Sequence, residues 1–155
     1  MTFNNLHQDV PQNCSCIENA TIIKENQIYT RFLKYPEIES RYFETHWEKW
    51  TKKGKIPTFV KQNDCANICL YKNASVDNYT DENRAWIINY YLKQFRVTQK
   101  DKNAILVFQL KPKAGLIEHT PSEKNPFHHS FFKEDEFSID SIEIIELIEL
   151  KNENI

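Results

Sequence analysis

The chain has 155 residues, with 20 Lys and Arg against 22 Asp and Glu, for a net charge of −2 at pH 7. That balance lacks the basic footprint of general nucleic-acid binding, so we expect no general DNA binding. Only two glycines occur, which excludes phosphate loops built from clustered glycines, such as GxGxxG.

A single domain is expected at this length. Residues 1–20 are polar and rich in Asn and Gln, which predicts a flexible N-terminal arm ahead of one α+β domain over residues 21–155. No secretory signal and no long apolar run is visible. We therefore expect no membrane contact and a cytoplasmic protein, or a toxin module that is delivered without a classical signal peptide.

The first predicted strand covers residues 28–33, which alternate and are rich in β-formers. Pro36 then opens a helix from about Glu37 to Lys53, because Tyr42, Trp47 and Trp50 recur at helical spacing. His46 falls on the same face and is expected to be a packed core histidine.

Residues 56–61 and 67–71 are short and β-like, and both are candidate strands. Thr80 is expected to begin a second helix, with Asn83 as the partner in its cap. The apolar face of that helix is predicted to be Ala85, Trp86, Ile88, Tyr91, Leu92 and Phe95.

Residues 103–111 form the clearest predicted strand, with residues 116–118 as a short continuation after a turn. Residues 137–150 favour a strand with a bulge because isoleucine is dense there, although the glutamate spacing also suits a helix. These elements predict an α+β fold, a small mixed or antiparallel sheet with two main amphipathic helices packed against it.

The four cysteines form a CxC…CxxxC pattern, with Cys14 and Cys16 in one half and Cys65 and Cys69 in the other. Structural zinc sites prefer CxxC spacing, and neither half has it. Without a secretory signal, we expect free thiols and no metal. Zinc binding and disulfides are the alternatives.

Three of the five histidines, His119, His128 and His129, lie within eleven residues. Histidine changes charge near neutral pH, so such a cluster is a natural place for chemistry. The adjacent pair would point to opposite faces of a strand, which weakens a metal site. One histidine with Glu134 or Glu136 suits general acid–base catalysis, and His119 with one of the pair suits a metal-independent RNase. A loop without catalytic function is the alternative.

From residue 28 onward, the order of elements resembles ADP-ribosyltransferase-like toxin domains. Arg31 stands in a strand similar to the one that holds NAD in that family, and Ser75 lies where the family has a polar motif with serine. Glu134 and Glu136 look like the family's catalytic ExE pair before a final apolar strand. The resemblance implies NAD as the cofactor and cleavage of its glycosidic bond, with Arg31 clamping the pyrophosphate.

Together, the residues and the resemblance assign catalysis to His128, His129, Glu134 and Glu136, and cofactor binding to Arg31 and His119, with no metal. If the chain is an enzyme acting on a nucleotide, RNA or protein substrate, these residues should line one pocket. The competing hypothesis is a non-enzymatic binding protein with a protein partner, such as an immunity protein or a phage-type inhibitor. Small size, mild acidity and many aromatics suit that class equally.

Overall fold

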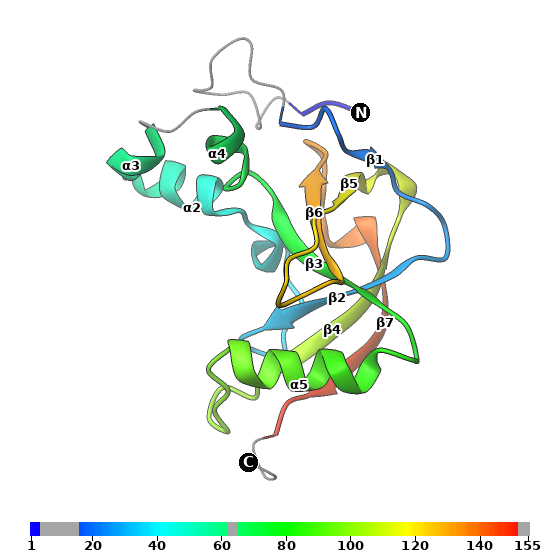
Figure 1. Cartoon of the computed structure of the whole chain (residues 1–155). Helices are drawn as coiled ribbons and strands as arrows, with labels where there is room; N and C mark the ends of the chain where they lie inside the picture. Colours follow the sequence, from blue (N-terminus) through cyan, green and yellow to red (C-terminus); the bar gives the residue numbers. More distant parts are fainter. Residues whose placement is uncertain (4–15, 62–64, 152–155) are drawn as a thin grey trace.

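The computed structural model describes residues 1–3, 16–61 and 65–151. Within them, seven strands form one antiparallel sheet in the order β1-β5-β6-β3-β2-β4-β7 (Figure 1). The α+β expectation is confirmed, with a larger sheet than the sequence suggested. The strands are β1 (Thr21–Ile22), β2 (Ile28–Leu33), β3 (Ala74–Tyr79), β4 (Ala104–Leu110), β5 (Gly115–His119), β6 (His128–Lys133) and β7 (Ile142–Glu149).

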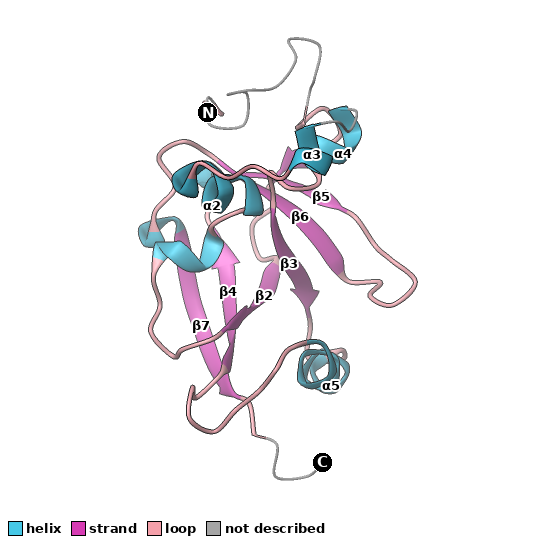
Figure 2. Ribbon diagram, turned by 90° about the vertical axis from the view of Figure 1, so that its left-hand side faces the viewer, coloured by secondary structure: helices cyan, strands magenta, loops and turns pink. Residues whose placement is uncertain are grey.

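The sheet divides between β2 and β3. Over its whole length β2 pairs with β4, but only residues 28–30 of β2 pair with β3. Beyond Thr30, β3 continues beside β6 instead, as residues 74–77 pair with residues 128–131. Figure 2 shows the result, with β2, β4 and β7 running together and β3, β6 and β5 leaning away from them. The edges of β2 and β3 that face this split are therefore open to side chains and ligands.

Each face of the sheet packs against a different layer, as the two-residue period of a strand requires. On β4, Leu106 and Phe108 enter the core under Phe43, whereas Ile105 and Val107 face helix α5 (Arg84–Gln94). All four of these β4 side chains are fully buried. Figure 1 shows α5 at the opposite end of the molecule from α2, α3 and α4.

The predicted helix from Glu37 to Lys53 is two elements, a 3-10 turn η1 (Ser40–Phe43) and helix α2 (His46–Lys53). Thr45 interrupts it, because its hydroxyl accepts a bond from the Glu48 backbone while the Glu48 carboxylate accepts one from the Thr45 backbone. This capping box starts a new helix and could be read from the T-x-x-E spacing. The predicted helix is confirmed over α2, but the residues before Thr45 do not belong to the same helix. His46 is exposed rather than packed in the core.

Two predicted strands are short helices, α3 (Thr58–Lys61) and α4 (Cys65–Cys69). Val60 and Ile68 pack with Trp47 of α2 in a separate small core. Strand propensity mostly reflects packing on a sheet surface, and these residues pack on a helix instead. None of the helices among the described residues has both the length and the apolar character needed to cross a bilayer.

The second helix begins at Arg84 rather than at Thr80, since Thr80 and Asn83 form reciprocal bonds of 2.8 and 3.2 Å within the preceding turn. Its buried residues are Ile87 and Tyr91, whereas Trp86 is 37% exposed. The C-terminal strand with a bulge is confirmed. In its pairing with β4, Val107 lies opposite Glu146 and the next residue lies opposite Ile144, so one β7 residue is extra.

The expectation of free thiols is wrong. Cys16 and Cys69 form a disulfide, Cys65 is also disulfide-bonded, and none of the described cysteines is free. The sequence signal was ambiguous because the bond joins residues 53 positions apart. Two described residues of the predicted flexible arm are bonded to the rest of the protein. Cys16 forms its disulfide with Cys69, and the Thr2 carbonyl accepts a 2.9 Å hydrogen bond from the Asp135 backbone N–H. The intervening residues 4–15 lie outside the described residues.

Candidate functional site

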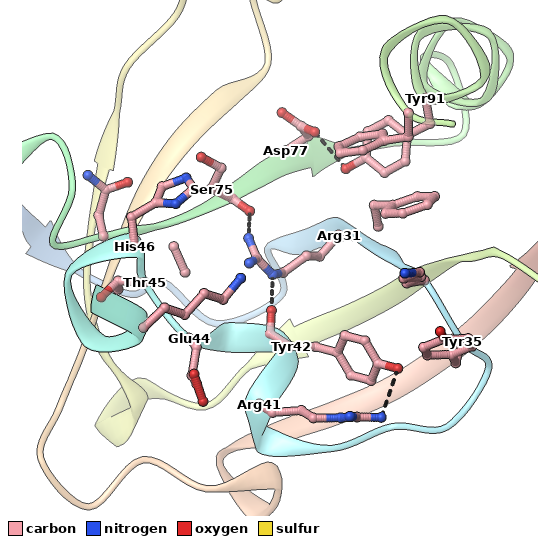
Figure 3. Close-up of a pocket in the computed structure, with 16 residues that line it drawn as sticks. Arg31, Tyr35, Arg41, Tyr42, Glu44, Thr45, His46, Ser75, Asp77 and Tyr91 are labelled. Atoms are coloured by element: carbon pink, nitrogen blue, oxygen red, sulfur yellow. Dashed lines mark hydrogen bonds between the residues drawn. The ribbon is translucent and has the colours of Figure 1, made fainter. Parts of the chain in front are cut away.

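A cavity of about 590 Å³ opens in the split between β2 and β3. It is bounded by the end of β2, by η1 and the start of α2, by β3, and by α5 (Figure 3). Cationic and aromatic side chains dominate its lining: Arg31, Lys34, Arg41, His46, Lys49, Phe32, Tyr35, Tyr42, Tyr91 and Phe95. This volume and this mixture of rings with a few polar groups are typical of small-molecule sites.

Arg31 reaches into the split, as Figure 3 shows. Its Nε donates to the carbonyl of Tyr42, and its Nη1 donates to the carbonyl of Ser75, each at 2.5 Å. Those two bonds use only part of the donor set of a guanidinium. Burial lowers the pKa of Arg31, while Tyr91 and Asp77 oppose the shift. Because arginine remains protonated at every physiological pH, a fixed positive charge stands at the centre of the cavity wall.

A buried polar network around Asp77 supports the far wall of the cavity. One carboxylate oxygen accepts a 2.6 Å bond from the Tyr91 hydroxyl, and the other accepts a 2.7 Å bond from the Asn125 amide. The Tyr91 hydroxyl also lies 3.0 Å from that of Thr30. Burial raises the pKa of Tyr91 well above its usual range, with the Asp77 charge acting in the same direction. Tyr91 therefore stays a neutral donor that holds the carboxylate in place.

Ser75 and His128 form a second polar pair on the cavity side of β3 and β6. Ser75 is exposed and lines the cavity, and its hydroxyl lies 3.0 Å from His128 Nε2. The other ring nitrogen of His128 lies 3.0 Å from the Thr120 carbonyl and 2.8 Å from the Thr120 hydroxyl. We call the cavity between β2 and β3 the Arg31 cavity. Of the four predicted catalytic residues, His128 is the one with a hydrogen bond to a residue of its lining, Ser75.

His119 and His129 lie on the opposite face of the sheet. They are register partners on β5 and β6, and their rings stack at 4.6 Å between centroids. With Tyr29 they line a separate, smaller cavity of about 220 Å³. His128 and His129 therefore point to opposite faces of β6, as strand alternation predicts. The three histidines of the cluster are divided between two sites.

Glu134 and Glu136 follow the far end of β6. Glu134 is about 13 Å further along the strand direction than Ser130, at about 3.3 Å per residue. Its carboxylate accepts bonds from the Thr2 hydroxyl and from the Glu136 backbone, and it lines a different cavity beside Lys133. The expectation of one pocket shared by Arg31, the histidines and these glutamates is wrong, because the length of β6 and its two faces keep them apart.

Sequence reasoning missed most of the residues that surround Arg31. Asp77 and Tyr91 were not assigned to a site, and Ser75 was noted only as a motif position. The available signal was the polar alternation of β3, in which Ser75 and Asp77 share one face while Ala74 and Val76 are buried on the other. Because alternate residues of a strand point to the same face, this order places the Ser75 and Asp77 side chains together.

His129 should make the stability of the protein depend on pH. Burial lowers its pKa, and the charges of His119 and His128 act in the same direction, while the bond to the Phe127 carbonyl opposes them. The unfolded chain then binds a proton first as the pH falls below the ordinary histidine value of about 6.5. Stability is therefore lost from there down through the lowered folded value.

We expect the urea midpoint of the wild-type protein to fall more between pH 7.5 and pH 5 than that of His129→Gln. Between pH 7.5 and pH 8.5 the two proteins should change equally, because His129 is neutral in both the folded and unfolded states there. Parallel midpoints across the acidic range would contradict this assignment.

Among the described residues, no group of three or more His, Cys, Asp or Glu side chains is placed to hold a metal ion. No family model, curated protein or solved structure matches the chain.

Proposed function

We propose that the cavity between β2 and β3 binds a nucleotide-class ligand, an anionic molecule with flat rings. NAD is the member of that class which the resemblance to ADP-ribosyltransferase-like domains implies. The observation that carries the proposal is the contact between Arg31 and Ser75 at the cavity wall. These are the two positions at which the sequence resembles the NAD-holding strand and the serine motif of that family.

The charge of the lining supports an anionic ligand. Lys34 and Lys49 are exposed at the cavity and add to the positive charge of Arg31. Of the two lining carboxylates, Glu44 is paired with Lys52 at 2.6 Å, and Asp77 keeps its negative charge while it accepts bonds from the neutral Tyr91 and Asn125. Arg31, Lys34 and Lys49 outnumber Asp77, so the lining carries an excess of positive charge. A guanidinium fork matches the geometry of phosphate oxygens.

The aromatic residues support a ligand with rings. Tyr35 and Tyr42 border the cavity on one side, and Phe95 borders it on the other, stacked on Phe32 at 4.2 Å. Such faces can take a base by stacking, which contributes about 1–3 kcal/mol per base where it has been measured in nucleic-acid complexes. The cavity volume lies within the usual range for ligands of this size.

ADP-ribosyl transfer is the reaction that the resemblance attaches to such a ligand. Glu134 and Glu136 do not line the cavity, so this proposal rests on binding first and treats nicotinamide release as a second readout. The disulfide between Cys16 and Cys69 supports the alternative of a delivered module over a cytoplasmic protein. Disulfides persist in oxidising compartments and are rare in the cytosol.

Calorimetric titration with NAD, ADP-ribose and ATP tests the proposal. We expect Arg31→Lys and Lys49→Gln each to weaken binding, the first by about 10–100-fold, because a lost charge-assisted bond costs about 1.5–3 kcal/mol. Arg31→Lys keeps the charge and loses the fork, so it separates geometry from net charge. Lys113→Gln, which removes a charge on the turn before β5, is the control and should bind as the wild type does.

The proposal fails if none of the three nucleotides binds to the folded protein. It also fails if both cavity variants bind with wild-type affinity. Nicotinamide release from NAD by the wild-type protein would extend the proposal from binding to cleavage of the glycosidic bond.

A further inference from the structure

Ser75 and His128 are brought together by the pairing of β3 with β6. In that pairing Ser75 lies opposite Ser130, and Asp77 lies opposite His128, so Ser75 and His128 are diagonal neighbours on one face. The Ser75 hydroxyl and His128 Nε2 are 3.0 Å apart. Diagonal neighbours on antiparallel strands are within reach of long side chains. The pair lies on two rigid strands, and its hydroxyl is exposed at the cavity.

The surroundings of His128 select its tautomer. Nδ1 lies 3.0 Å from the Thr120 carbonyl oxygen, which can only accept a hydrogen bond. An Nδ1 lone pair would face that oxygen unfavourably, so Nδ1 carries the proton and Nε2 carries the lone pair. The Thr120 hydroxyl can accept from the same N–H and donate to the Ser130 hydroxyl, 2.9 Å away. Nε2 is then the acceptor of the Ser75 hydroxyl proton.

We propose that Ser75 is a nucleophile, that His128 is its general base, and that the chain hydrolyses a phosphoric ester or anhydride at the edge of the Arg31 cavity. A serine within hydrogen-bond reach of a histidine that is itself oriented by a third group is the structural signature of an activated nucleophile. The substrate class rests on the proposed nucleotide-class ligand, whereas the reactivity of Ser75 does not.

The position of Arg31 favours phosphorus as the electrophilic centre. Its Nη1 donates to the backbone carbonyl of Ser75, so the guanidinium charge is held beside the residue that carries the nucleophile. A phosphoryl group attacked by Ser75 accumulates negative charge on its non-bridging oxygens. A fixed cation beside it stabilises that charge without reorganising during the reaction.

The reaction proceeds in two balanced steps. Ser75 Oγ attacks phosphorus, its proton passes to His128 Nε2, and the bond to the leaving oxygen breaks as that oxygen takes the proton from His128. Water then attacks the phosphoserine, His128 accepts a proton from it, and the bond between phosphorus and Oγ breaks as Oγ is reprotonated. Throughout, His128 Nδ1–H keeps its bond to the Thr120 carbonyl, which stabilises the transient imidazolium.

A fluorophosphonate probe tests the nucleophile without knowledge of the natural substrate. In this reaction the Ser75 Oγ–P bond forms, the P–F bond breaks, and fluoride leaves with the serine proton. Intact-mass spectrometry of diisopropyl fluorophosphate-treated protein should show one adduct, and peptide mapping should place it on Ser75. Ser75→Ala should remove the adduct, and His128→Gln should slow labelling by about 100-fold or more.

Exposed Ser40, at the start of η1, provides the matched control, since Ser40→Ala should label as the wild type does. Thermal melts establish that each variant is folded before labelling. Absence of the adduct in the folded wild-type protein, or an adduct that survives Ser75→Ala, would overturn the proposal.

Chromogenic substrates decide the substrate class. Bis(p-nitrophenyl) phosphate should be hydrolysed in a manner that requires Ser75 and His128, and p-nitrophenyl acetate should be a poorer substrate. Hydrolysis of the acetate alone would reject the phosphoester chemistry. A labelled Ser75 in a protein that binds no nucleotide would overturn the proposed ligand and leave the nucleophile standing, so the two failures are distinguishable.

Discussion

Removal of the Cys16–Cys69 disulfide is expected to lower the free energy of unfolding by at most about 4 kcal/mol, because the second disulfide at Cys65 also constrains the unfolded chain. The bond joins residues 53 positions apart, and closing a loop of that length in the unfolded chain removes entropy worth about 4 kcal/mol at 25 °C. The bond also ties the N-terminal segment to α4, where Cys16 packs with Phe132. Urea unfolding of the Cys16→Ser/Cys69→Ser double variant, followed by circular dichroism, measures this loss.

The two single variants provide the control for this experiment. Each single change already breaks the bond, so Cys16→Ser, Cys69→Ser and the double variant should lose similar amounts of stability. Losses in the double variant that equal the sum of the two singles would show that packing of the two sulfurs, rather than the covalent link, supplies the stability.

Trp47→Ala is expected to destabilise the protein by about 3–5 kcal/mol, the usual cost of truncating a buried tryptophan. Trp47 is only 6% exposed and packs with Val60 and Ile68 between the helices. The ammonium of Lys72 lies 4.2 Å from the centre of its ring, and Lys72 is itself buried. The substitution therefore removes both an apolar contact surface and a cation–π partner of a buried cation.

Lys49→Ala in the same helix is the matched control. Lys49 is exposed, and surface substitutions of this kind usually change stability by about 0.5 kcal/mol or less. Far-UV circular dichroism suits the comparison because it does not depend on tryptophan fluorescence. Equal melting temperatures for the two variants would refute the role of Trp47 as the centre of the small core formed by α2, α3 and α4.

The local sequence pattern was sufficient to predict the strands whose side chains alternate regularly between two faces. Residues 28–33 and 103–111 were predicted as strands and form β2 and β4. The isoleucine-rich C-terminal segment was predicted as a strand with a bulge and forms β7. Residues that alternate between two buried faces carry this information in their own order, so no distant contact is needed to read it.

Helix boundaries were less predictable, because short-range polar contacts override the apolar period. The Thr45–Glu48 capping box divides one expected helix into two elements, and the Thr80–Asn83 turn delays the next helix to Arg84. Residues 56–61 and 67–71 have strand-like composition, yet they pack on α2 as short helices or turns. Their partners lie elsewhere in the chain, so composition alone could not identify them.

The sequence by itself determined that this is an α+β chain, that Arg31 stands on an early strand, and that His128 and His129 face opposite ways. Each of these depends only on residue order and on the period of a strand. The tertiary structure decided where the strands meet. The split beyond Thr30 places Arg31 beside Ser75, and the β3–β6 register places Ser75 beside His128. The same sheet holds Glu134 at the other end of β6, and the fold brings Cys16 to Cys69. Contacts between residues so distant in sequence depend on the packing of the whole sheet, which no local pattern encodes.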